Sequence, residues 1–85
     1  MKIIKRNGAE VEFDKLKIVA AMLKAFKEQH ETVDSDMMCS INKIAGEIER
    51  LSFDRDLHVE EIQDIVEKKL MATKYKEVAK AVLAI

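Results

Sequence analysis

Two adjacent cations beside a tight-turn dipeptide are the residues of this 85-residue chain that most clearly could do chemistry. Lys5 and Arg6 directly precede Asn7-Gly8, and Lys17 follows in the segment after the turn. Ammonium and guanidinium groups beside the start of a helix favour the binding of a small anion such as a phosphate. Charge-assisted contacts contribute roughly 1.5–3 kcal/mol each, so three of them could hold a polyphosphate at micromolar concentration.

The distribution of charge favours a local anion site over a polymer-binding surface. The net charge is −1, with an isoelectric point near 6.1. Residues 1–27 contain seven Lys or Arg against three Asp or Glu, whereas residues 28–85 contain eight against thirteen. A basic segment on a slightly acidic chain suits a small anion better than a nucleic acid. We therefore expect no DNA partner.

The segment that carries the cations, residues 3–13, predicts a β-hairpin. Apolar and polar residues alternate on both sides of Asn7-Gly8, the dipeptide that best tolerates the positive φ angles of a two-residue type I′ turn. Counting outward from such a turn predicts that Arg6 pairs with Ala9, Lys5 with Glu10, Ile4 with Val11 and Lys2 with Phe13.

This predicted register gives the two cations different surroundings. Arg6 would share a face with the apolar residues that cover the core, where an unpaired charge is costly. No acidic partner is evident on that face, and a bound anion would serve. Lys5 could instead form a cross-strand ion pair with Glu10, worth about 0.5 kcal/mol.

Four helices are expected after the hairpin. Asp14 is placed to cap the first, which runs to about Gln29, and Asp34 or Ser35 caps the second. Residues 59–72 read as the third, and Thr73 caps the fourth. Apolar residues of the first helix recur at helical spacing and predict its buried face: Leu16, Ile18, Ala21, Met22, Ala25 and Phe26.

The remaining elements complete an α+β fold. Gly46 interrupts the second helix at a cost of about 1 kcal/mol relative to alanine, so we expect a neighbouring backbone to approach it closely. Residues 52–59 break the helical period and could add a short strand beside the hairpin. The elements predict a small sheet, built from the hairpin and that strand, covering a four-helix bundle.

Several classes of function are disfavoured by composition. There is no run of 18 apolar residues and no secretory signal, so we expect no membrane partner and a cytoplasmic location. Cys39 is the only cysteine, and His30 and His58 are isolated, so neither a disulfide within the chain nor a metal site is expected. No arrangement of a nucleophile with a base is evident, and we expect the chain not to be an enzyme.

Two blocks of the sequence resemble the ATP-cone family. The stretch IIKRNGAEVEFDKLKI, residues 3–18, resembles the opening signature of this regulatory domain, which occurs at the N-terminus of many ribonucleotide reductases and in the zinc-ribbon repressor of their genes. The signature elements are Ile3-Ile4, Lys5-Arg6, Asn7, Gly8, Phe13-Asp14 and Lys17-Ile18. Residues 57–81 are similar to the C-terminal helices of the family, especially in the anaerobic, glycyl-radical class. The single Cys39 argues against the four-cysteine repressor.

The resemblance implies a mixed three-stranded sheet over four helices, with a nucleotide bound between the two. It implies that Lys5 and Arg6 contact phosphates and that Lys17 reaches the phosphates or the ribose. Val59 and Gln63 fall where members of the family contact the base; Gln63 could equally face solvent. The full set of site residues implied is Ile4, Lys5, Arg6, Asn7, Gly8, Lys17, Val59 and Gln63.

The function implied is that of a single regulatory domain, residues 1–85, that binds ATP or dATP with Mg²⁺. In the family, these nucleotides change the activity or the oligomeric state of the reductase, so the implied partners are a reductase catalytic chain or domain and a second copy of the domain. The sequence ends AKAVLAI, without the family's Tyr-x-x-Tyr-Arg-like ending. The alternative is therefore a protein-interaction module that keeps the fold but has lost nucleotide binding. An excised domain and a stand-alone protein both remain open, as do one or two bound nucleotides.

Overall fold

The computed structural model describes residues 2–82 and shows the predicted α+β fold. Its three strands form one mixed sheet in the order β2-β1-β3, in which β1 is antiparallel to β2 and parallel to β3. The elements in chain order are β1 (Lys2–Ile4), β2 (Glu10–Glu12), α1 (Lys15–Gln29), α2 (Ser35–Asp54), β3 (Leu57–His58), α3 (Val59–Met71) and α4 (Lys76–Ala81).

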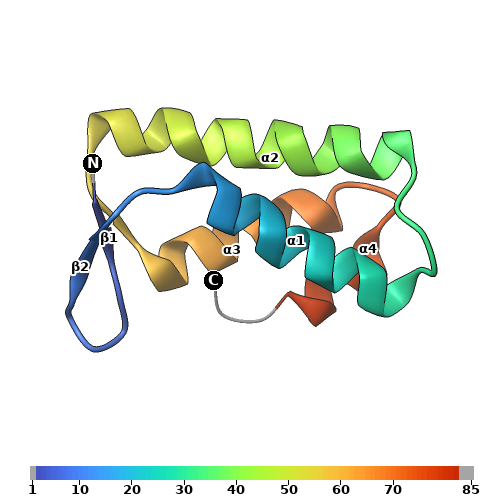
Figure 1. Cartoon of the computed structure of the whole chain (residues 1–85), viewed down its shortest axis with the longest axis horizontal. Helices are drawn as coiled ribbons and strands as arrows, with labels where there is room; N and C mark the ends of the chain where they lie inside the picture. Colours follow the sequence, from blue (N-terminus) through green and yellow to red (C-terminus); the bar gives the residue numbers. More distant parts are fainter. Residues whose placement is uncertain (1, 83–85) are drawn as a thin grey trace.

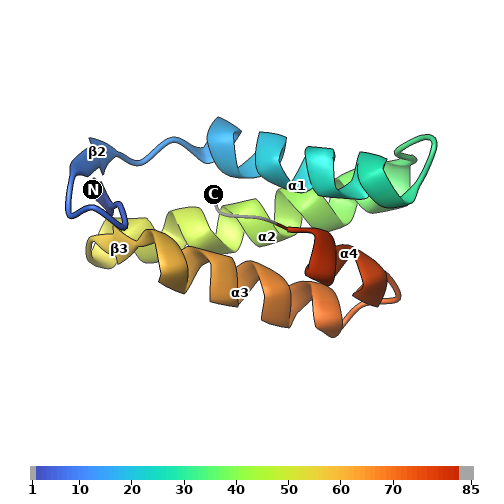
Figure 2. The same ribbon diagram turned by 90° about the horizontal axis from the view of Figure 1, so that it is seen from below.

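The sheet lies at one end of the helices. Figure 1 shows the hairpin of β1 and β2 beside the place where α2 ends and α3 begins, and Figure 2 shows the same end from below. The long helix α2 runs back along α1, while the short α4 packs between α1 and α3. The loop of the hairpin is therefore held next to the start of α3, far from the loops at the opposite end.

Side chains just before α1 and α2 fix where those helices begin. Asp14 accepts a hydrogen bond from Leu16 N at 3.0 Å, and Asp34 accepts one from Met37 N at 2.9 Å. These contacts satisfy N–H groups that a helix cannot bond internally, and they confirm both predicted caps. Thr73 does not cap α4, which begins after Tyr75, but its hydroxyl oxygen accepts from Tyr75 N at 3.1 Å.

The core is formed by one apolar face of each helix and one residue from each of two strands. Phe26 is fully buried and packs edge-on against the ring of Tyr75, with 5.3 Å between ring centroids. The most deeply buried apolar side chains are Ile18, Met22, Phe26, Ile41, Ala45, Ile48, Leu57, Ile62, Val66, Leu70 and Val78. Within residues 2–82, no helix is both long enough and apolar enough to cross a membrane.

Two further predictions about the helices are wrong. Leu16 does not join the buried face of α1 and is 74% exposed, because a residue two positions from the buried Ile18 lies on roughly the opposite side of the helix. Gly46 is not approached by a neighbouring backbone, since nothing outside its own helix lies within 4 Å of the position a Cβ would take. The cost of this glycine in α2 therefore has no packing compensation among the described residues.

The predicted register of the hairpin is also wrong, by one residue. Ile3 pairs with Val11 and Ile4 with Glu10, and the loop between Lys5 and Ala9 has three residues instead of two. A slip of one residue moves side chains to the opposite face of a strand. Ile3, not Ile4, is thus the residue of β1 that joins the core.

Candidate functional site

An open hollow of about 340 Å³ lies between the hairpin loop and the start of α3. It is lined by Lys5, Arg6, Asn7 and Val59. The three loop residues are exposed, whereas Val59 is only 4% exposed and provides an apolar surface. Two cations thus border a partly apolar hollow whose volume is within the roughly 300–1,000 Å³ typical of small-molecule sites.

The parallel pairing of β1 with β3 creates this hollow. Ile4 at the end of β1 pairs with His58 at the end of β3. Because both strands run in the same direction, the residues that follow them emerge at the same edge of the sheet. Lys5 and Arg6 therefore lie next to Val59 and the rest of the first turn of α3.

A compact turn holds the loop that carries the cations. Gly8 N donates to the carbonyl oxygen of Lys5 at 2.9 Å, and Lys5 N donates to that of Ala9 at 2.8 Å. Gly8 has a φ of 85°, which is strained for residues other than glycine. The Asn7 side chain accepts from Ala9 N at 3.0 Å. This is a three-residue hairpin loop with a glycine bulge, not the predicted type I′ turn.

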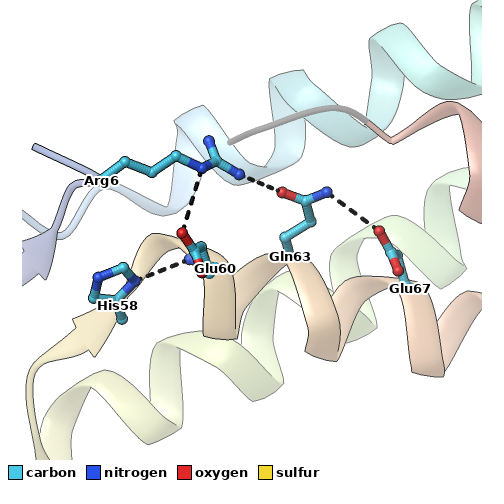
Figure 3. A network of polar contacts seen from close by, with 5 residues as sticks. All are labelled: Arg6, His58, Glu60, Gln63 and Glu67. Atoms are coloured by element: carbon cyan, nitrogen blue, oxygen red, sulfur yellow. Dashed lines mark hydrogen bonds and ion pairs between the residues drawn. The ribbon is translucent and has the colours of Figure 1, made fainter.

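Arg6 reaches across the hollow to α3, as Figure 3 shows. Its Nη2 donates to Gln63 Oε1 at 3.0 Å, and its Nε lies 3.6 Å from Glu60 Oε1. Gln63 Nε2 donates in turn to Glu67 Oε1 at 3.3 Å. The orientation of the Gln63 amide follows from chemistry, because a guanidinium only donates and a carboxylate only accepts. Arg6 is therefore not directed into the core, and its partners come from α3.

The first turn of α3 is itself fixed by its neighbours. His58 caps the helix, its Nδ1 accepting from Glu60 N at 3.3 Å. Arg55 makes a two-pronged ion pair with Glu61, in which Nη1 donates to Oε1 at 2.8 Å. The hydrogen bonds from Arg55 hold the pKa of Glu61 below its ordinary value. Of the two glutamates here, Glu61 pairs with Arg55 and Glu60 with Arg6.

The helix whose start lies beside the hollow is α3, not α1. Lys15, in the first turn of α1, forms an ion pair with Glu49 of α2 at 3.7 Å. The positive end of the helix dipole beside Arg6 belongs to α3. Within residues 2–82, Lys5 forms no ion pair, and the expected pair with Glu10 is absent.

The structure brings most of the predicted site residues together at this end of the sheet. Gln63 is included through its hydrogen bond to Arg6. Ile4 lies half-buried at the end of β1, and Gly8 lies exposed in the loop. Lys17 is exposed on the first turn of α1 and is not among the residues that line the hollow.

Glu60 is the contact of Arg6 that sequence reasoning missed. In the sequence, its position near the start of a helix indicates only that it complements the helix dipole. One available signal was spacing, since Glu60 lies three residues before Gln63 and therefore on the same face of α3. That spacing points to Arg6 only when the parallel pairing of β1 and β3 is known, because this pairing places Arg6 beside α3.

Comparison with known proteins connects this geometry to one family. The family model described as "ATP cone domain" matches residues 1–85. The chain is 39% identical over 80 residues to the ribonucleoside-diphosphate reductase subunit alpha of Treponema pallidum, an alignment that covers 88% of this chain and 9% of the relative.

Further relatives include a second kind of reductase. The ribonucleoside-diphosphate reductase subunit alpha of Chlamydia pneumoniae is 36% identical over 85 residues, with 92% of this chain and 8% of the relative covered. The anaerobic ribonucleoside-triphosphate reductase of Haemophilus influenzae is 35% identical over 82 residues, with 93% and 11% covered. The chain thus spans about a tenth of the length of these relatives. Together with the fold and the full-length match, these similarities establish that the chain belongs to the ATP cone domain family.

Proposed function

We propose that the hollow beside Lys5 and Arg6 binds ATP or dATP, and that occupancy regulates a ribonucleotide reductase. ATP cone domains bind ATP or dATP. The observation that carries the proposal for this chain is the meeting of Lys5, Arg6 and the N-terminus of α3 at a hollow with an apolar wall. Cations and a helix N-terminus favour phosphates, and an apolar surface favours a base.

Each site residue has a role in this proposal. Lys5 and Arg6 contact the phosphates, and Asn7 and Gly8 shape the loop around them; Ile4 lines the sheet side. The base lies toward Val59 and Gln63, because the Gln63 amide offers both a donor and an acceptor to the edge of adenine. Lys17 reaches the phosphates or the ribose from α1.

Mg²⁺ is expected to arrive with the phosphates. Within residues 2–82, no three His, Cys, Asp or Glu side chains are grouped to hold a metal ion. Mg²⁺ on nucleotides commonly keeps several waters and takes phosphate oxygens with only one or two carboxylates. A dedicated protein cage is therefore not required.

The regulatory part of the proposal follows from the relatives. Those named above are reductases, and this chain corresponds to about a tenth of each. We infer a non-catalytic role in which ATP and dATP favour different activities or oligomeric states of a cytoplasmic reductase, with either a catalytic chain or a second copy as partner. This requires each nucleotide to bind one state better than the other.

One observation supports a second candidate, an interaction module without nucleotide. Leu16 and Phe53 are large apolar side chains that are 74% and 65% exposed. Exposed apolar groups can form a contact with a protein partner. In this alternative the fold is retained, and substitutions at Lys5 or Arg6 change no ligand binding because there is none.

Isothermal titration with ATP, dATP and GTP in magnesium buffer tests the proposal. We expect binding selective for the adenine nucleotides and at least about a tenfold loss of affinity in Arg6→Ala, given roughly 1.5–3 kcal/mol for a charge-assisted contact. Arg50→Ala is the matched control, since Arg50 is an exposed arginine that lines a separate hollow. A folded protein that gives no heat with any nucleotide would favour the interaction module.

A further inference from the structure

We propose that Glu60 is a built-in competitor for the anion at Arg6, and that it lowers the affinity of the site for polyphosphates. This inference rests on the proposed function, since it concerns the same site. In the structure the only carboxylate within ion-pair distance of the Arg6 guanidinium, among residues 2–82, is that of Glu60. A phosphate at Arg6 must therefore displace this carboxylate or share the guanidinium with it.

The contacts of Arg6 show that its hydrogen-bonding capacity is already partly used. Nη2 is bonded to Gln63 at 3.0 Å, and Nε faces Glu60 at 3.6 Å. A guanidinium has five N–H donors in a fixed planar fork. Both partners lie on the α3 side, as Figure 3 shows, so rotation of the fork toward a ligand would release contacts made in the free protein.

Charge gives Glu60 a second effect on a bound anion. The carboxylate lies in the first turn of α3, where it offsets the positive end of the helix dipole that would otherwise attract a phosphate. It also repels any phosphate held at Arg6. Both effects act against binding, so neutralising Glu60 should strengthen the site.

The neighbouring Glu61 provides a matched control. It lies in the same turn of α3 and carries the same charge, but its carboxylate pairs with Arg55 instead of Arg6. Glu60→Gln and Glu61→Gln therefore change the net charge and the charge at the helix start equally. Only Glu60→Gln removes the ion pair of Arg6.

The test is titration of the folded wild type, Glu60→Gln and Glu61→Gln with ATP and with inorganic tripolyphosphate. Removing an exposed ion pair that competes with the ligand should change the Kd for that ligand roughly two- to fivefold. We expect tighter binding of both ligands by that factor in Glu60→Gln, and a smaller gain in Glu61→Gln, which removes only the charge at the helix start. The Arg6 Nε–H NMR signal should move in Glu60→Gln alone, which a merely structural effect on α3 would not produce.

Tripolyphosphate separates this inference from the proposed function. Tighter tripolyphosphate binding in Glu60→Gln without ATP binding would support the competitor while rejecting the nucleotide site. Equal gains in both variants would indicate general electrostatics and overturn the inference. A loss of affinity in Glu60→Gln would overturn it as well, as would the absence of tripolyphosphate binding in all three proteins.

Discussion

The Arg55–Glu61 pair shows how a single contact fixes the surroundings of the hollow. It joins the residue just after α2 to the first turn of α3, on either side of β3. Because both carboxylate oxygens take part, the pair fixes an orientation as well as a distance. It also leaves Glu60 as the glutamate of this turn that faces Arg6.

This pair should give folding stability a measurable acid dependence. The pKa of Glu61 is lowered in the folded protein by its hydrogen bonds to Arg55, whereas the unfolded value is about 4.3. Between the two values the folded state binds fewer protons, so the free energy of unfolding falls as the pH falls through that window. We expect Glu61→Gln to unfold at a lower temperature than the wild type at pH 6, with the difference shrinking towards pH 3. A difference independent of pH would contradict this assignment.

At the residue scale, the sequence predicted the Lys5-Arg6 pair beside a glycine turn but not what Arg6 touches, and Lys17, which was grouped with them, does not line the hollow. The Lys5-Arg6 pair and the glycine turn could be recognised because both depend on neighbouring residues. The contacts of Arg6 with Glu60 and Gln63 join residues more than fifty positions apart. Such contacts depend on strand pairing, which local patterns do not determine.

At the scale of elements, the two glycines of this chain are expected to respond oppositely to alanine. Gly8 has a φ of 85°, where a Cβ costs roughly 1–2 kcal/mol. Gly46 lies within α2 with open space around its Cβ position, so alanine should add about 1 kcal/mol. Chemical denaturation should show destabilisation in Gly8→Ala and stabilisation in Gly46→Ala. A Gly8→Ala protein with the same free energy of unfolding as the wild type would contradict the turn described here.

The helices were predictable from sequence and the sheet was only partly so. Helix starts at Asp14 and Asp34 follow from local capping chemistry, and the apolar period indicated the buried faces. The hairpin register failed because Asn-Gly can occupy either a two-residue turn or a three-residue loop with a glycine bulge. The number of loop residues is decided by which β1 residue enters the core, here Ile3.

At the scale of the whole molecule, the proposed ligand bridges two parts of the chain that are distant in sequence. Its contacts come from the hairpin loop and from α3, which are joined through β1 and β3. A ligand that binds only when these parts are assembled stabilises the folded state.

Nucleotide should therefore raise the unfolding temperature strongly. At a free concentration one hundred times its Kd, a ligand adds about 2.7 kcal/mol. For a domain of this size, that corresponds to a rise of roughly 10–20 °C. Differential scanning fluorimetry with ATP and dATP measures the shift, and GTP serves as the control. An equal rise with GTP would contradict adenine selectivity.

The most direct test of the central claim is an NMR titration that locates the ligand. Amide signals of the isotopically labelled protein would be followed while ATP is added in magnesium buffer. We expect the largest changes to fall on residues 5–8 and 59–63, which surround the hollow, while the middle of α2 is unaffected. Changes centred on another surface, or none at saturating ATP, would contradict it.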